Sequence, residues 1–110
     1  MILYDKQKYN CAHHAINRIN ECHSTNIHFA DGDEWQVSFI RMMRKRFTEV
    51  SKPVDNCLVV MTSRGVSHLG FFTNWMIEHN YNTGGNGSVI LSDIGTINSD
   101  FERVRYYVVN

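Results

Sequence analysis

The sequence has little of what marks disordered or membrane-spanning chains. Its 110 residues include one proline, and 43% of them are apolar, which is typical of a globular chain. No stretch approaches the ~20 apolar residues needed to span a bilayer. The length suits one core, so we expect residues 1–110 to form a single domain.

Net charge is also lacking. Eleven basic and eleven acidic residues give a formal net charge of zero, so we expect no global attraction to nucleic acid or to an anionic membrane. The one basic run, within residues 41–46, is interpreted as the solvated face of a helix. We therefore expect a chain with no nucleic-acid or membrane partner.

Cysteine is too scarce for a disulfide scaffold. Three cysteines are an odd number, whereas small secreted domains use paired cysteines. We expect Cys22 and Cys57 to be core residues. The first six residues lack the charged and long apolar regions of a signal peptide, so no signal peptide is expected.

The recognised zinc spacings are missing as well. The sequence has no Cys-x-x-Cys pair and no His-x-x-x-His pair on a helix, so we expect no metal and no other cofactor. The alternative is a zinc site on Cys11 and His14, which could share a helix face. Otherwise we expect His13 and His14 to be exposed or to line a cleft.

Two amphipathic helices are predicted in the first half of the chain. Residues 10–23 begin with Asn10, a good N-cap, and carry apolar residues at helical spacing. Residues 34–50 form the second predicted helix, which Pro53 ends. Its apolar stripe comprises Trp35, Phe39, Met43, Phe47 and Val50.

From residue 57 the periodicity becomes that of strands. The predicted strands are 57–61, 66–73, 75–81, 88–91 and 103–109. Turns are expected at 63–65 and near Asn74, a loop at 83–87, and a turn of helix within 92–101. This order predicts an α+β fold, with N-terminal helices packed on a small antiparallel sheet.

Cys11 is a candidate nucleophile because it follows the predicted N-cap. The helix dipole and the N–H groups of a helix N-terminus stabilise a thiolate there. The backbone N–H of Cys11 could also donate to an oxyanion.

His68 is the candidate base. In a half-buried strand its side chain points away from Leu69 and shares a face with Gly70 and Phe72. We expect the small Gly70 to leave open space beside the imidazole, which a catalytic histidine needs.

The third candidate lies on the next strand. A Cys-His enzyme uses a further polar group to fix the tautomer of its base. His79 can lie across a hairpin from His68, while Glu78 and Asn80 would point to the other face. A one-residue bulge would exchange these assignments.

These segments together resemble the NlpC-type cell-wall peptidases, above all short phage-borne ones. The similar pieces are Tyr9-Asn10-Cys11, residues 57–61, the Ser-His-Leu-Gly-Phe-Phe run at 67–72 and residues 76–79. The resemblance covers residues 9–109 and keeps the order Cys, His, polar residue. Asn-Cys-Ala-His-His also resembles the helix start of lecithin retinol acyltransferase-like proteins, but those carry histidine before cysteine.

The resemblance implies a papain-like fold and a metal-free hydrolase of amide bonds in peptidoglycan stem peptides. It assigns Cys11 as nucleophile, His68 as base and His79 as orienting group. Tyr9, Asn10 and Gly70 become oxyanion or substrate-binding candidates, with Tyr4 as another tyrosine.

The expected partner is thus a peptide or peptidoglycan, and the expected location is cytoplasmic or virion-associated. Two alternatives stay open. One is a non-catalytic phage structural or host-protein-binding module on the same fold. The other is a protein-directed acyltransferase or deamidase. The sequence does not specify the oligomeric state.

Overall fold

One antiparallel sheet organises the chain. The computed structural model describes residues 11–27, 41, 43–83 and 86–110. The elements in chain order are α1 (Cys11–His23), β1 (Phe47–Val50), β2 (Leu58–Ser63), β3 (Val66–Thr73), β4 (Met76–Thr83), β5 (Asn86–Asp93), α3 (Ile94–Asp100) and β6 (Arg103–Val109).

The six strands lie in the order β1-β6-β2-β3-β4-β5. Every neighbouring pair is antiparallel. The last strand, β6, lies between β1 and β2 and pairs with both, so it joins the edge strand β1 to the rest of the sheet. The predicted α+β class is confirmed.

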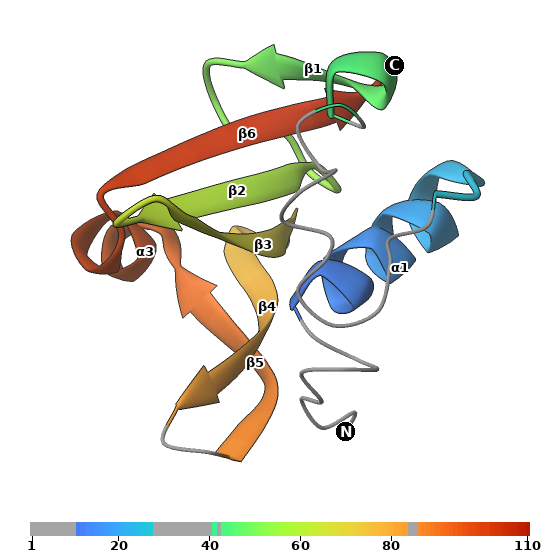
Figure 1. The fold of residues 1–110 in the computed structure, drawn as a ribbon. Helices are drawn as coiled ribbons and strands as arrows, with labels where there is room; N and C mark the ends of the chain where they lie inside the picture. The colour runs from blue at the N-terminus through green and yellow to red at the C-terminus, as the bar shows by residue number, and fades with distance from the viewer. Residues whose placement is uncertain (1–10, 28–40, 42, 84–85) are drawn as a thin grey trace.

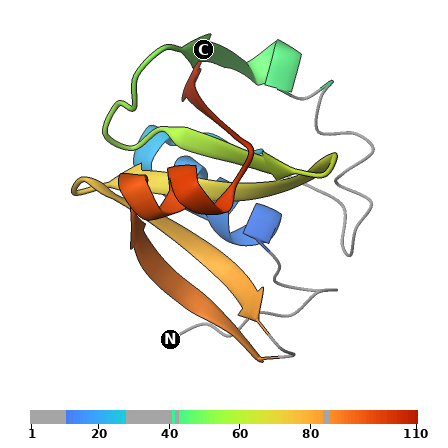
Figure 2. The same ribbon diagram turned by 90° about the vertical axis from the view of Figure 1, so that its left-hand side faces the viewer.

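The two faces of the sheet carry separate apolar clusters. One contains the buried residues of α1 together with Leu58, Val60, Leu69 and Phe71. The other contains their strand neighbours, among them Val59, Met61 and Phe72, together with Ile97 of α3. Figures 1 and 2 show α1 and α3 on opposite sides of the sheet. A side chain on one of these strands therefore faces either α1 or α3, according to the alternation of the strand.

Helix α1 forms because its apolar residues recur at helical spacing. Ala12, Ala15, Ile16 and Ile19 are buried on one stripe. Beyond the helix, the Asn20 side chain accepts a hydrogen bond from the Ile27 N–H and donates one to the Ile27 carbonyl. These bonds hold the chain that leaves α1 against the helix.

Two tight turns set the strand registers. Arg64 and Gly65 between β2 and β3, and Asn74 and Trp75 between β3 and β4, all have φ between +51° and +77°. Two consecutive residues with positive φ are what a type I′ hairpin turn requires. The second turn aligns Thr73 with Met76 and Phe71 with Glu78, which places the histidines of β3 and β4.

The prediction of a helix over residues 34–50 is wrong at its end. Residues 43–46 are helical, but Phe47–Val50 is strand β1. Phe47 and Val50 fit a helical stripe, yet Thr48 and Val50 are β-branched and favour a strand. Pairing with β6 decides in favour of the strand, because that partner lies about 60 residues away in the sequence. Residues 34–40 and 42 lie outside the described residues.

The other predicted elements differ from the structure mainly at their ends. Strands 66–73 and 103–109 are confirmed, as is a short helix within 92–101. Strands β4 and β5 reach further than predicted, to Thr83 and from Asn86. Thr83, Asn86 and Gly87 of the predicted loop instead belong to the paired strands, and residues 84–85 lie outside the described residues.

Candidate functional site

His68 on β3 and His79 on β4 form a hydrogen-bonded pair. The distance from His68 Nε2 to His79 Nδ1 is 2.9 Å, so one nitrogen donates its proton and the other accepts. The last ladder pair between β3 and β4 is Phe71–Glu78, and the two histidines lie just beyond it, one on each strand. The structure thus brings these two predicted residues together.

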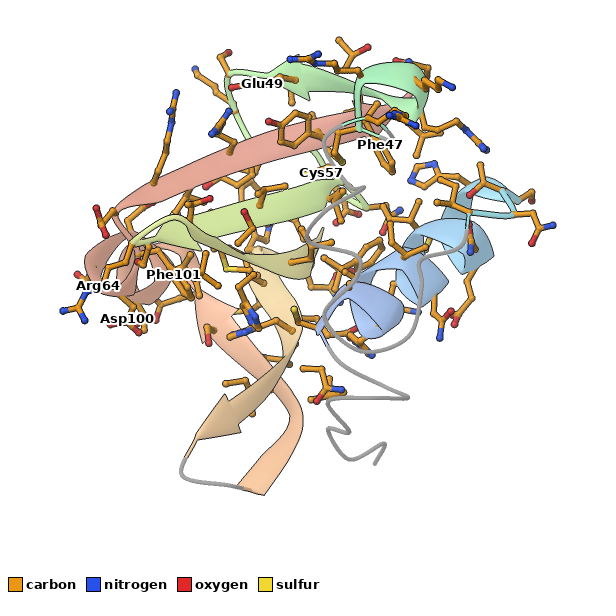
Figure 3. The ribbon with its side chains drawn as sticks, in the orientation of Figure 1. Phe47, Glu49, Cys57, Arg64, Asp100 and Phe101 are labelled. Carbon is orange, nitrogen blue, oxygen red and sulfur yellow. The ribbon has the colours of Figure 1, made fainter. Side chains whose placement is uncertain are left out.

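Further contacts fix both rings. His79 Nε2 lies 3.0 Å from the hydroxyl oxygen of Ser92 on β5. The His68 ring stacks on Phe101, with centroids 5.9 Å apart and planes at 4°. Figure 3 shows Phe101 at the end of α3. The imidazoles, Ser92 and Phe101 therefore form one ordered group on the α3 side of the sheet.

Both imidazoles are neutral at pH 7. Burial, and then the neighbouring His79, lower the pKa of His68 from 6.5 to about 3. Burial is also the main cause that lowers the pKa of His79 to about 4; His14 lowers it further and Asp100 opposes the shift. A neutral imidazole can accept a proton, but these low pKa values make the pair a weak base unless an anion lies beside it.

Cys11 is the first residue of α1 and is buried. It belongs to the apolar cluster that includes Leu69 and Phe71, which is the cluster on the α1 side of the sheet. His68 and His79 face the α3 side. The pairing of Cys11 with His68 therefore stays a prediction.

The sequence interpretation missed a polar cluster between α1 and β4. His14 Nε2 and Arg18 Nε lie 2.8 and 2.9 Å from one carboxylate oxygen of Glu78. The Arg18 guanidinium also lies over the Phe71 ring, 4.9 Å from its centroid. The sequence predicts His13 and His14 to be exposed or to line a cleft. His14 is buried, so the first of these alternatives is wrong for it, and the side chain of His13 lies outside the described part of the chain. The spacing of Cys11, His14 and Arg18, which puts them on one face of a helix, could have predicted that these polar side chains lie together.

The space expected beside Gly70 is filled. A Cβ at Gly70 would lie 2.8 Å from Ile77 Cγ2 and 2.9 Å from Met61 Cε. Gly70 therefore permits close packing between β2, β3 and β4, and the prediction that it opens room beside His68 is wrong. Tyr9 and Asn10, the other two oxyanion or substrate-binding candidates, lie outside the described residues.

The remaining cysteines divide between core and surface. Cys57 is buried, as predicted, but Cys22 is exposed, because the last turn of α1 has its side chains in solvent. Within the described ranges, no group of three or more histidine, cysteine, aspartate or glutamate side chains could hold a metal ion. No helix in the same ranges is long and apolar enough to cross a membrane.

Comparison of the chain with family models, curated proteins and solved structures finds no match.

Proposed function

We propose that the chain is a cysteine hydrolase with an NlpC-type, papain-like fold that cleaves amide bonds in peptidoglycan stem peptides, in a phage or phage-derived setting. Cys11 is the nucleophile, His68 the base and His79 the group that orients the base. The observation that carries the proposal is the 2.9 Å hydrogen bond between His68 and His79, because a base held by a second polar group is the arrangement that Cys-His enzymes use.

Helix α1 packs on β3 and β4, the strands that carry the two imidazoles, which supports Cys11 as nucleophile. His14 follows Cys11 by three residues, so both side chains leave the same face of the helix. His14 contacts Glu78, the neighbour of His79, and charge on His14 acts on the pKa of His79. The ladder between β3 and β4 comprises the three pairs from Phe71–Glu78 to Thr73–Met76, so it ends before the two imidazoles. The proposal requires the Cys11 sulfur to reach them there.

The reaction follows from these roles. His68 takes the proton of the Cys11 thiol, and the thiolate attacks the amide carbonyl carbon. The backbone N–H of Cys11 holds the oxyanion. The C–N bond then breaks, the leaving amine takes the proton from His68, and a thioester remains on Cys11. Water hydrolyses the thioester, with His68 as base, and restores the thiol.

The placement of Cys11 favours a second candidate. Its side chain is buried in the apolar cluster on the α1 side, where free cysteine often serves as a small core residue. A structural or host-protein-binding module on the same fold would use Cys11 in that way.

Digestion of purified peptidoglycan decides between the two candidates. The wild-type chain should release soluble muropeptides, whereas Cys11→Ala and His68→Gln should release none. Cys22→Ala is the matched control, since it removes an exposed thiol from the other end of α1 and should leave the release unchanged. No release by the wild type, or equal release by Cys11→Ala, would contradict the proposed hydrolase.

A further inference from the structure

A groove of about 670 Å³ crosses the α1 side of the sheet, over β1, β6, β2 and β3. This volume lies within the range of small-ligand sites, which is roughly 300–1,000 Å³. Phe47 and Val60 are buried beneath it, and Tyr107 is half-buried. Figure 3 shows Phe47 and Glu49 on β1, and both residues line the groove at the edge strand of the sheet. The base of the groove is therefore apolar, and most of its lining residues lie on strands.

Arg105 on β6 lines this groove and has an unsatisfied donor. Its Nε is buried and has no hydrogen-bond partner within the part of the chain that the structure describes. A guanidinium keeps its charge at all ordinary pH values and presents a planar fork that matches a carboxylate. A buried donor without an acceptor is unfavourable, so a ligand oxygen in the groove would satisfy it.

The charges along the groove suit a peptide with a carboxylate. Arg44 and Arg105 are two cations and Glu49 is one anion among its lining residues, so the groove favours an anionic group. Glu49 on β1 and Ser67 on β3 are three strand spacings apart, or roughly 14 Å. An extended chain of about four residues covers that length.

We propose that this groove binds a short extended peptide whose carboxylate pairs with Arg105. The choice of a peptide as ligand rests on the proposed function. The groove extends that function by indicating where the peptide binds and that its bound group is anionic. Ser67, at one end of the groove, directly precedes His68. The groove also lies on the side of the sheet that carries Cys11, so a bound peptide would extend towards α1.

Peptide binding to the Cys11→Ala chain tests this inference without requiring hydrolysis. The probes are acetyl-Ala-Glu-Lys-Ala with a free C-terminus and acetyl-Ala-Gln-Lys-Ala-amide, which has no carboxylate. Titration followed by backbone amide NMR gives both the affinity and the location. We expect the acidic peptide to bind about tenfold more tightly, since charge-assisted hydrogen bonds are the stronger ones, and to shift the amide signals of Arg105, Thr62 and Ser67.

Arg105→Gln should remove that preference, so that both peptides bind with the affinity of the amide. Arg105→Lys keeps the charge without the fork and should bind the acid with intermediate affinity. Arg103→Gln makes the same charge change two residues away on β6. It should alter binding less than about twofold, since Arg103 is exposed and is not among the residues that line the groove. The NMR spectra also report whether each variant is folded.

Equal affinity for the two peptides, shifts outside the groove, or no binding at millimolar peptide would overturn the inference. An unchanged preference in folded Arg105→Gln would do the same. These outcomes are separate from those for the proposed function, because loss of muropeptide release with intact peptide binding rejects only the hydrolase. Muropeptide release together with equal affinity for the acidic and the amide peptide rejects only the peptide-binding groove.

Discussion

Acidification from pH 7.5 to 5.0 should destabilise the fold, because His68 and His79 are neutral in the folded protein. Burial lowers their pKa values from 6.5 to about 3 and about 4. In the unfolded chain both imidazoles regain a pKa of about 6.5 and take up protons at pH 5. Since the unfolded state then binds more protons, stability is complete above about pH 6.5 and falls as the pH drops towards 4.

The size of the effect depends mainly on the unfolded state, since both folded pKa values lie below pH 5. The pH is then about 1.5 units below the unfolded pKa, and each unit corresponds to about 1.36 kcal/mol. Each histidine should therefore cost about 2 kcal/mol, and the pair about 4 kcal/mol. His68→Gln keeps a polar group near His79 and should remove about half of this loss.

Urea unfolding at the two pH values measures the loss. The Cys11→Ala chain is the background, because a thiolate beside His68 would raise the pKa of the imidazole. Subtracting the result for His68→Gln isolates His68, since the other titrating groups are shared. His23→Gln, on the exposed end of α1, controls for the removal of one imidazole. If the chain with His68→Gln lost as much stability as its parent, the interpretation of the pair as buried and neutral would be wrong.

Two further predictions concern the packing on either side of the pair. Gly70→Ala should lower the free energy of unfolding by about 1–3 kcal/mol, because its Cβ would lie 2.8 Å from Ile77 Cγ2; a urea midpoint equal to the wild type's would show that the contact relaxes freely. Glu78→Gln should cost about 2–3 kcal/mol by the same assay, since it leaves His14 and Arg18 beside a neutral amide in a largely buried place. Glu21→Gln is its control, because the carboxylate of Glu21 pairs with Arg18 from an exposed position; equal losses in the two variants would contradict a special role for Glu78.

The sequence predicts best where local pattern and turn chemistry agree. Strand 66–73 alternates between the two faces, and the residues on either side of it take up type I′ turns. The pairing of His68 with His79 followed from the same two features, because a short turn leaves few possible registers.

The predictions that were wrong concern residues whose structure depends on contacts with distant parts of the chain. Residues 47–50 fit a helix until β6 is placed beside them. The burial of His14 depends on Glu78, 64 residues later in the chain. Gly70 looks like an opening in the strand, yet the side chains of neighbouring strands fill the space. The hydrophobic pattern of a single segment does not reveal any of these contacts.

Alkylation of Cys11 at pH 6 tests the proposed nucleophile most directly. An unperturbed thiol with a pKa of about 8.5 is only ~0.3% ionised at that pH, and burial raises the pKa of Cys57. If Cys11 pairs with His68, iodoacetamide should label it at least about tenfold faster than Cys22 and Cys57, and His68→Gln should abolish the difference. Labelling of Cys11 no faster than that of the exposed Cys22, or unchanged by His68→Gln, would contradict the Cys-His hydrolase.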